Sequence, residues 1–256
     1  MGRIITIANQ KGGVGKTTTA INLSACLAEA GQHVMLVDFD PQGNASSGLG
    51  VEKEDYEHTV YDMMAEEADL DECLVKNNQD NLDVLPSDMN LAGAEIEFQE
   101  VEDKETLLKR YLDKVRDDYD FILIDCPPSL NILTINALTA ADTVLVPIQC
   151  EYYALEGLNQ VLKTVELVKR KLNPQLELEG VVFTMYDART NLSLQVVESV
   201  KNNLNQTIYK TIIPRNVRLA EAPSHGMSIN LYDTRSTGAE SYRMLAAEVM
   251  SRGEEL

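Results

Sequence analysis

The run Lys11-Gly-Gly-Val-Gly-Lys-Thr-Thr-Thr19 constrains this chain more than any other. It follows an apolar, β-prone run at 4–8 and precedes a helix-like run at 20–29, so the order is strand, glycine loop, helix. Consecutive backbone N–H groups in such a loop, together with the helix N-terminus, form a cradle for anions. Lys16 is placed to reach β- and γ-phosphates, and the Thr17 hydroxyl to ligate Mg²⁺. A glycine turn with incidental lysines would share the composition, but the spacing and both flanks favour a phosphate-binding loop.

Two further apolar runs end in carboxylates. The runs 33–38 and 120–125 are typical of buried parallel strands, and they end at Asp38 and Asp125. Ligands bind at the carboxyl ends of strands in open α/β sheets, so we expect Asp38, Asp40 and Asp125 to face the phosphate site. A carboxylate there can hold Mg²⁺ or align a water for attack on a γ-phosphate. Two acids in a solvated turn remain the alternative for Asp38 and Asp40.

The rest of the chain alternates β-type runs with helical patterns. This alternation implies right-handed crossovers, and hence an α/β fold with a mostly parallel sheet flanked by helices on both faces. Further strands are predicted at 81–86, 143–147, 179–184 and 209–214. Helices are predicted at 17–30, 132–140, 151–172, 193–204 and 236–256. With 256 residues, the chain is expected to form a single domain over 1–256.

The composition argues against several classes of protein. A hydrophobic content of 44% and a charged content of 25% are ordinary for a soluble globular protein. No run approaches the roughly 18 apolar residues of a membrane helix, and the start of the chain leads into a strand-like run too short for a signal peptide. The cysteines are isolated, with no C-x-x-C, so we expect buried thiols in a reducing cytoplasm rather than disulfides or a zinc site. They are Cys26, Cys73, Cys126 and Cys150.

Charge is distributed unevenly along the chain. The net charge is −19, but residues 51–105 alone hold 19 acidic residues against three lysines. A solvated charged face is the simplest interpretation of that segment, and a docking surface for a partner is the alternative. Residues 185–235 hold six basic residues against four acidic ones. Because local charge sets the attraction for phosphate, a basic patch is compatible with the acidic total.

The glycine loop departs from G-x-x-x-x-G-K-[ST] at its first glycine, where Gln10 stands, and Lys11 adds a second cation. Lys-Gly-Gly-x-Gly-Lys-Thr resembles the deviant Walker A group of P-loop ATPases, which includes ParA/Soj partition proteins, MinD, the nitrogenase iron protein and the arsenite-pump ATPase. The runs 125–129, 185–191 and 213–226 are similar to the ParA/Soj subfamily in particular. The resemblance covers nearly the whole chain and implies the P-loop NTPase fold.

The resemblance also implies a role for each matching residue. Lys11 would reach across a dimer interface to the nucleotide of the other subunit, Asp40 would orient the attacking water, and Asp125 would be the Walker B aspartate. Pro214 and Asn216 would lie against the adenine. The implied site comprises the catalytic residues Lys11, Lys16 and Asp40; the nucleotide contacts Lys11, Gly12, Gly13, Val14, Gly15, Lys16, Thr17, Thr18, Pro214 and Asn216; the Mg²⁺ site Thr17, Asp38 and Asp125; and the DNA contacts Arg189 and Arg218.

The function implied by the resemblance is a cycle of DNA binding driven by ATP and Mg²⁺. An ATP sandwich homodimer would bind double-stranded DNA nonspecifically and leave it when a ParB-type centromere-binding protein stimulates hydrolysis during chromosome or plasmid segregation. The protein is expected in the cytoplasm, on the nucleoid and not at a membrane. The choice of chromosome or plasmid, the ParB partner, a link to the replication initiator and the role of the acidic segment stay open.

Three other functions fit the same loop less well. A MinD-like positioning ATPase would carry a basic amphipathic helix at its C-terminus, whereas this chain ends in an acidic stretch. A metal-cluster carrier would need paired cysteines, which are absent. A tyrosine kinase of the related bacterial type would need a C-terminal tyrosine cluster, and only Tyr232 and Tyr242 occur there.

Overall fold

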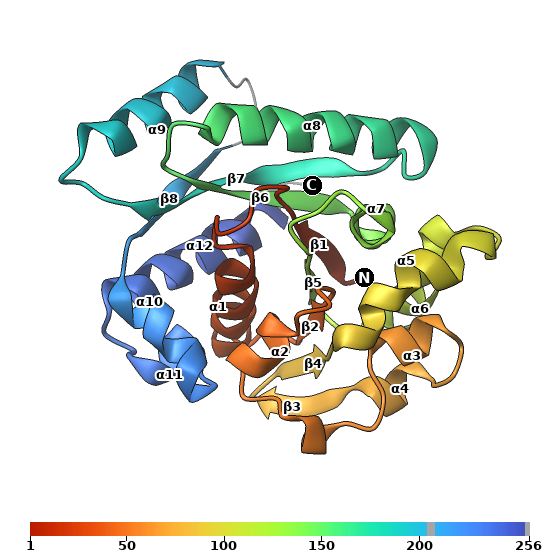
Figure 1. Cartoon of the computed structure of the whole chain (residues 1–256). Helices are drawn as coiled ribbons and strands as arrows, with labels where there is room; N and C mark the ends of the chain where they lie inside the picture. The colour runs from red at the N-terminus through yellow and green to blue at the C-terminus, as the bar shows by residue number, and fades with distance from the viewer. Residues whose placement is uncertain (204–207, 254–256) are drawn as a thin grey trace.

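One eight-stranded sheet organises the molecule (Figure 1). The computed structural model describes residues 1–203 and 208–253. Within them the strand order is β3-β4-β2-β5-β1-β6-β7-β8, and every neighbouring pair is parallel except β3 and β4. The strands are β1 Arg3–Ile7, β2 Val34–Asp38, β3 Val75–Gln79, β4 Leu82–Leu85, β5 Phe121–Asp125, β6 Thr143–Gln149, β7 Glu177–Tyr186 and β8 Ile208–Pro214. The expected mostly parallel sheet is confirmed.

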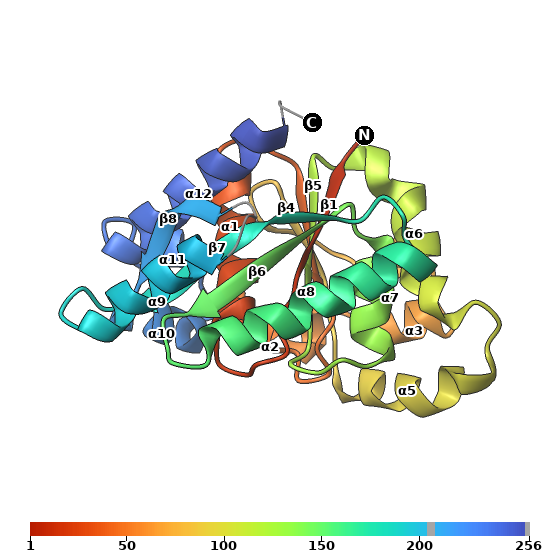
Figure 2. The same ribbon diagram turned by 90° about the horizontal axis from the view of Figure 1, so that it is seen from above.

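Helices cover both faces of this sheet (Figures 1 and 2). On one face α1 packs with α12, and on the other α6, α7, α8 and α9 pack in sequence. The helices are α1 Lys16–Glu29, α2 Asn44–Gly48, α3 Val60–Met64, α4 Leu70–Cys73, α5 Ala94–Glu97, α6 Leu107–Val115, α7 Ile132–Ala140, α8 Ala154–Lys171, α9 Asn191–Asn203, α10 Val217–Glu221, α11 Ile229–Tyr232 and α12 Thr237–Gly253. Short 3-10 helices lie at Lys53–Asp55, Met89–Gly93, Phe98–Glu100, Lys104–Thr106, Arg116–Asp118 and Ala222–His225.

The two-residue period of the strands divides the core into two clusters. Along β1, Ile4 joins the cluster under α7 and α8, whereas Ile5 and Ile7 join the cluster under α1 and α12. All three side chains are fully buried. A strand that is apolar on both faces must be covered on both, which is why β1 lies at the centre of the sheet between β5 and β6.

The helix predictions are close at most boundaries. The helix expected at 132–140 coincides with α7, and Gly31 follows α1 with φ 87°, the left-handed conformation that commonly ends a helix. The helix expected from residue 151 begins at Ala154 instead, because residues 151–153 form a turn closed by the Ala154 N–H on the Glu151 carbonyl. The last residue of the helix expected at 193–204 and the last three of that at 236–256 lie outside the described residues.

One strand was not predicted. Strand β3 pairs antiparallel with β4 at the edge of the sheet, and its sequence Val-Lys-Asn-Asn-Gln has none of the apolar alternation that marks a half-buried strand. Polar edge strands are common because they discourage pairing with other chains. The acidic segment 51–105 therefore supplies two strands as well as charge. Its apolar side chains also enter the core, among them Val60, Met63, Leu85 and Leu91, all fully buried.

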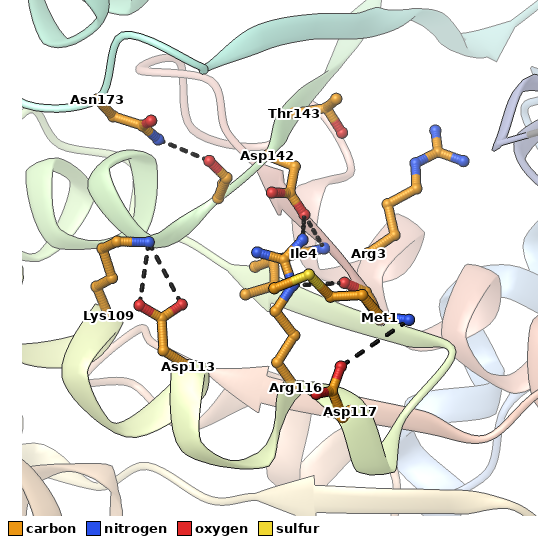
Figure 3. Close-up of polar contacts among 12 residues, drawn as sticks. Met1, Arg3, Ile4, Lys109, Asp113, Arg116, Asp117, Asp142, Thr143 and Asn173 are labelled. Carbon is orange, nitrogen blue, oxygen red and sulfur yellow. Dashed lines mark hydrogen bonds and ion pairs between the residues drawn. The ribbon is translucent and has the colours of Figure 1, made fainter. Parts of the chain in front are cut away.

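A polar clamp fastens the start of β1 to the neighbouring segments (Figure 3). One oxygen of Asp142 accepts the N–H of Ile4 at 2.8 Å and pairs with the Arg116 guanidinium at 2.6 Å. Arg116 also donates to the carbonyl of Gly2 at 2.8 Å. Close by, Asp117 forms only a 3.9 Å contact with the N-terminal ammonium of Met1, and both groups are mostly exposed.

We expect Asp142→Ala to lower the free energy of unfolding by about 2 kcal/mol, because it removes the acceptor for the Ile4 N–H and deprives the mostly buried Arg116 guanidinium of its carboxylate partner. Asp117→Ala is the matched control and should change stability by less than about 0.5 kcal/mol. Urea unfolding followed by circular dichroism measures both values. Equal losses in the two variants would contradict the clamp.

Candidate active site

The glycine loop connects the end of β1 to the start of α1, as expected. Gly13 and Gly15 have φ angles of 73° and 86°, in the left-handed region that favours glycine. Gly15 immediately precedes α1, so the first N–H groups of that helix, which have no partner inside it, face the loop. A 14-residue helix adds the positive end of its dipole at the same point.

Two side chains fix the loop to the neighbouring strands β6 and β7. Asn9 donates from Nδ2 to the Pro147 carbonyl at 2.8 Å and accepts the Lys11 N–H at 3.0 Å. The Thr184 hydroxyl donates to the Val14 carbonyl at 2.8 Å. Asn9 and Thr184 are both buried. Contacts with β6 and β7 therefore hold the loop in shape, which is the preorganisation that an anion cradle needs.

Asp38 lies at the carboxyl end of β2 and is completely buried. Its Oδ2 accepts two hydrogen bonds from Ser46, one from the N–H and one from the hydroxyl, each of 2.8 Å. Burial raises the pKa of Asp38 to about 6, and the hydrogen bonds from Ser46 limit the rise. Asp40, also buried, donates its N–H to Asp38 and accepts the Gln42 N–H at 3.0 Å. The interpretation of Asp38 and Asp40 as acids in a solvated turn is therefore wrong.

Asp125 lies level with Asp38 on the adjacent strand β5. Both of its carboxylate oxygens are buried, and neither has a hydrogen-bond partner among the described residues. Burial, followed by the neighbouring Asp38 carboxylate, raises the pKa of Asp125 well above its usual value. The Thr17 hydroxyl and the Lys16 ammonium oppose this rise from nearby, although Thr17 falls short of hydrogen-bond geometry.

The Lys16 side chain lies near the carboxylates of Asp125 and Asp40. It is buried, and its ammonium lies 3.4 Å from the Lys11 carbonyl. Burial lowers the pKa of Lys16, while the carboxylates of Asp125 and Asp40 act in the opposite direction. A buried cation without close ion pairing is stabilised by an incoming anion, since the anion replaces the hydration that burial removed.

These residues fit a small, hard cation bound together with phosphate. An unpartnered carboxylate beside a second carboxylate and a hydroxyl supplies oxygen ligands of the type that Mg²⁺ prefers. In the described chain no group of three or more His, Cys, Asp and Glu side chains could hold a metal alone. Mg²⁺ usually takes only one or two carboxylates and completes its shell with water and substrate phosphates, so the donor set suits a metal that arrives with a nucleotide.

The Lys11 side chain forms an ion pair within its own chain. Its ammonium pairs with Glu151 at 2.8 Å, and both side chains are partly exposed. Glu151 follows β6 and also accepts from the Gln149 amide. A half-exposed ion pair of this kind is worth at most about 1 kcal/mol, so Lys11 can exchange Glu151 for a phosphate at little cost.

A cavity of about 280 Å³ opens beside the loop and brings together residues that are far apart in the sequence. Pro214 and Asn216 line it, next to Gly15 and Thr18, so the residues expected at the base adjoin those expected at the phosphates. Its other walls are mostly apolar and suit a flat aromatic ring. They comprise Thr184, Met185, Ile213, Arg215, Leu219, Ala220 and Tyr242.

The amide of Asn216 already has two partners. Its Oδ1 accepts the Arg218 N–H and caps α10, and its Nδ2 donates to the Thr237 hydroxyl at 2.7 Å. Only one amide hydrogen is left for a base. Asn216 therefore first positions β8, α10 and α12 around the cavity, a role that its sequence context did not indicate.

Several residues of this site were missed at the level of sequence. Thr184 and Met185 follow the rule that ligands gather at strand carboxyl ends, which could have identified them. Ser46 and Glu151 hold Asp38 and Lys11 through pairings that no sequence pattern marks. Tyr242 comes from α12, more than 200 residues after the loop, and reaches it through a 3.1 Å hydrogen bond with Thr19.

The arginines expected to contact DNA are exposed at the same edge of the sheet. The Arg189 guanidinium makes a two-point pair with Asp187, at 2.9 and 2.7 Å, and these hydrogen bonds hold the pKa of Asp187 below its usual value. Arg218 pairs with Glu221 at 2.9 Å and lies 3.4 Å from Asp233. Both arginines are thus accessible, but each is partly neutralised by its own chain.

The cysteines behave as expected, since all four are free and buried. Burial raises the pKa of Cys126 well above its usual value, as befits an inert core thiol. No helix in residues 1–203 and 208–253 is both long and apolar enough to cross a membrane.

The sheet is mostly parallel, and a glycine loop follows β1. A lysine and a threonine begin α1, and aspartates end β2 and β5. Together these features define a P-loop NTPase. Residues 2–178 match the family model described as an AAA domain. The sporulation initiation inhibitor protein Soj of Bacillus subtilis is 60% identical over 99% of this chain and 100% of its own length. The chromosome partitioning protein ParA of Myxococcus xanthus is 51% identical over 98% of this chain and 89% of its own. The chain belongs to the Soj/ParA family of chromosome-partitioning ATPases.

Solved structures agree with this fold. Cobyrinic acid a,c-diamide synthase from Mycobacterium smegmatis, with a bound ATP analogue and magnesium, has a TM-score of 0.87 at 36% identity, covering 99% of this chain and 96% of that one. MinD from Pyrococcus horikoshii, complexed with Mg-ADP, has a TM-score of 0.81 at 27% identity, covering 99% and 98%. The same architecture therefore serves proteins with different names, while relatives that cover nearly the whole of this chain at 50% identity or more include chromosome partitioning proteins.

We expect Asp125→Asn to make the nucleotide-free protein more stable, by about 1–2 kcal/mol at pH 8, because it removes a buried charge that lacks a partner. The folded-state pKa of Asp125 lies above its unfolded value near 3.8, so the folded chain holds the proton more tightly and stability falls as the pH rises past that value. The gain from Asp125→Asn should therefore be smaller at pH 5 than at pH 8. Urea unfolding in EDTA at the two pH values measures it.

Asp118→Asn serves as the control, because Asp118 is an exposed acid near the other end of the same strand. It should shift stability by less than about 0.5 kcal/mol at both pH values. If Asp125→Asn proved less stable than the parent at pH 8, Asp125 would not carry the proposed uncompensated charge.

Proposed function

We propose that the whole chain, residues 1–256, acts as one ATPase domain that binds Mg–ATP between two copies, grips duplex DNA nonspecifically in that state and releases it after hydrolysis. The observation that carries this proposal is the buried Asp125, which has no hydrogen-bond partner in the described part of the chain and lies near Lys16 and the glycine loop. Such an arrangement is unfavourable in isolation and favourable once a phosphate and a divalent cation occupy it. Membership of the Soj/ParA family supports the partitioning role.

The position of each residue supports the nucleotide role that we propose for it. The loop and first-turn N–H groups, from Gly12 to Thr18, bind phosphate oxygens, and the Lys16 ammonium neutralises their charge. Thr17, Asp38 and Asp125 would hold Mg²⁺, which would neutralise negative charge on the phosphates. Asp40 accepts a hydrogen bond from the attacking water and aligns it with the γ-phosphate. The apolar cavity at Pro214 and Asn216 takes the base.

Lys11 links nucleotide binding to association of two copies. In the single chain it pairs with Glu151 at the edge of the site. Two copies that face each other across their loops would let Lys11 leave Glu151 for the other subunit's phosphates. The γ-phosphate then favours the dimer, and its loss on hydrolysis removes that preference. A ParB-type protein would act by speeding this hydrolysis.

DNA binding by the dimer depends on exposed arginines. Arg189 and Arg218 stand on segments that follow the adjacent strands β7 and β8. Their forked guanidinium groups suit phosphate oxygens, and two copies double the number of contacts without any reading of sequence. This cycle would place the protein on the nucleoid, in the cytoplasm.

A membrane-associated positioning ATPase like MinD is the alternative, and the MinD fold similarity is the observation in its favour. In this chain α12 packs against α1 and β8, and its side chains Tyr242, Leu245 and Val249 are buried in the core. That helix is used for folding and offers no free apolar face for lipid over its described length. Sedimentation with anionic vesicles in the presence of ATP distinguishes the two functions.

DNA binding with and without ATP tests the proposal directly. The parent protein should bind a random-sequence duplex at least about tenfold more tightly with Mg–ATP than without nucleotide, with a steep dependence on salt. Lys16→Ala should abolish the ATP effect while leaving the protein folded. Fluorescence anisotropy over a series of salt concentrations measures both. ATP-independent binding of the parent would refute the switch.

We expect Asp40→Ala to separate binding from turnover. The variant keeps the anion cradle, so ATP-dependent DNA binding should persist, while hydrolysis should fall by about 10²-fold or more because no carboxylate aligns the water. Phosphate release and DNA anisotropy give the two readouts. A folded variant that no longer bound DNA with ATP would show that Asp40 serves the dimer state rather than the chemical step.

A further inference from the structure

Helices α7 and α8 leave an open apolar groove between them. The two helices lie side by side on one face of the sheet (Figures 1 and 2). The groove has a volume of about 240 Å³, and none of the residues proposed to bind nucleotide, Mg²⁺ or DNA lines it. Three leucines on its walls are well exposed, namely Leu130 at 48%, Leu167 at 43% and Leu172 at 38%.

The apolar side chains of the groove come from separate segments of the chain. Leu130 precedes α7, Ile135 belongs to α7, and Leu167 and Val168 belong to α8. Single exposed leucines are ordinary on a protein surface and need no explanation. Several that line one hollow form a patch of the kind that binds another molecule.

The shape of the groove suits an α-helix. Its α8 wall runs from Thr164 to Leu172, which is about two helical turns or roughly 12 Å. A helix that lies in such a groove inserts apolar side chains at i, i+3 or i+4, and i+7. Addition of a strand would need a sheet edge with unpaired N–H and C=O groups, and two helices do not offer one.

The α8 side of the groove is basic. Lys171 lines the groove, and Lys163 and Arg170 lie on the same stripe of α8, because positions 163, 167, 170 and 171 follow the helical period. All three cations are exposed and have no hydrogen bond or ion pair within the described residues. Between 163 and 171 the helix holds four basic residues and one acidic residue, in a chain of net charge −19. Unpaired cations beside an apolar hollow complement an acidic partner.

One end of the groove reaches the glycine loop. Leu130 and Thr164 also border a narrow crevice that is lined by Gln10 and Pro127. The Gln10 amide donates to the Thr164 hydroxyl at 3.1 Å. A helix bound in the groove would therefore lie close to the residue that precedes Lys11.

We propose that the groove between α7 and α8 binds one amphipathic helix of an acidic partner protein. Its apolar side chains lie between Leu130, Leu167 and Leu172, and its carboxylates face the stripe of Lys163, Arg170 and Lys171. The inference goes beyond the proposed function, because the groove shares no residue with the nucleotide site or with the proposed DNA contacts.

The test uses two capped peptides of about 15 residues, a length at which an alanine-rich peptide is partly helical. Both carry leucine at i, i+4 and i+7, and the flanking positions are glutamate in one peptide and lysine in the other. Fluorescence anisotropy at about 0.1 M salt measures binding to the full-length protein without nucleotide. The glutamate peptide should bind about tenfold more tightly than the lysine peptide. Nonspecific attraction to a chain of net charge −19 would give the opposite order.

Two pairs of variants locate the binding site. Leu167→Asp should weaken binding of the glutamate peptide by about tenfold or more, because it places a like charge on the apolar wall. Leu194→Asp is its control, since Leu194 is 50% exposed on α9 and does not line the groove. Lys171→Glu should remove most of the preference for the glutamate peptide. Lys169→Glu should keep it, because Lys169 lies two residues away and faces another side of α8.

Each other outcome would overturn the inference. It fails if neither peptide binds, if the lysine peptide binds more tightly, or if Leu167→Asp loses no more affinity than Leu194→Asp. It also fails if Leu167→Asp lowers the association of two copies with Mg–ATP, since the groove would then serve a second copy of the chain. ATP-dependent DNA binding should persist in Leu167→Asp, so a failure of the groove leaves the proposed function intact. Absence of ATP-dependent DNA binding in the parent would refute that function alone.

Discussion

The buried carboxylate of Asp125 is the constraint on which the rest of the site depends. Among the described residues it has no hydrogen-bond partner, and it lies at the end of β5, level with Asp38 on β2 and close to Lys16. Two neighbouring carboxylates repel each other in a medium of low polarity, and a single lysine offsets only part of this repulsion. The surrounding strands are apolar on both faces and hold the groups in place. The fold thus stores an unfavourable charge arrangement that a cation and an anion together can relieve.

The cations proposed to contact phosphate share one feature, an ion pair within their own chain. Lys11, Arg189 and Arg218 are each paired with a carboxylate of the same chain, and all of these pairs are partly or largely exposed. Exposed ion pairs are weak, so they orient a cation and still allow it to exchange its carboxylate for another anion. Exchange of a carboxylate for a phosphate would let the same side chain serve the isolated chain and the assembled one. The strongly acidic total charge of −19 is compatible with this arrangement, because it is concentrated elsewhere in the chain.

The helices connect the two parts of the molecule. Helix α12 packs on α1 through buried apolar residues, and its Tyr242 reaches Thr19 behind the glycine loop. Helix α10 carries Arg218, and Asn216 joins α10 to α12 beside the cavity. The nucleotide pocket and the arginine surface therefore share a short, rigid group of elements.

The sequence by itself determined the glycine loop, the aspartates at the ends of two apolar strands and the alternation that produces a mostly parallel sheet. These features are local, since a spacing of glycines and lysines or a run of β-branched residues expresses its preference within one or two turns of chain. It also located the described parts of α1, α7, α8, α9 and α12 to within a few residues, but not the short helices between them. It missed β3, whose polar residues pair only because an edge strand has no need of a second apolar face.

Tertiary structure alone decided how these local pieces work together. Only the register of β2 on β5 places Asp38 level with Asp125, and only the packing of α12 brings Tyr242 to the loop. Ser46, Glu151 and Asp187 could not be assigned as partners of Asp38, Lys11 and Arg189 from the chain order, because a hydrogen bond depends on distances of a few tenths of an ångström. The sequence specifies which groups are present, and the fold sets which of them meet, since burial and distance together govern the energy of every charge.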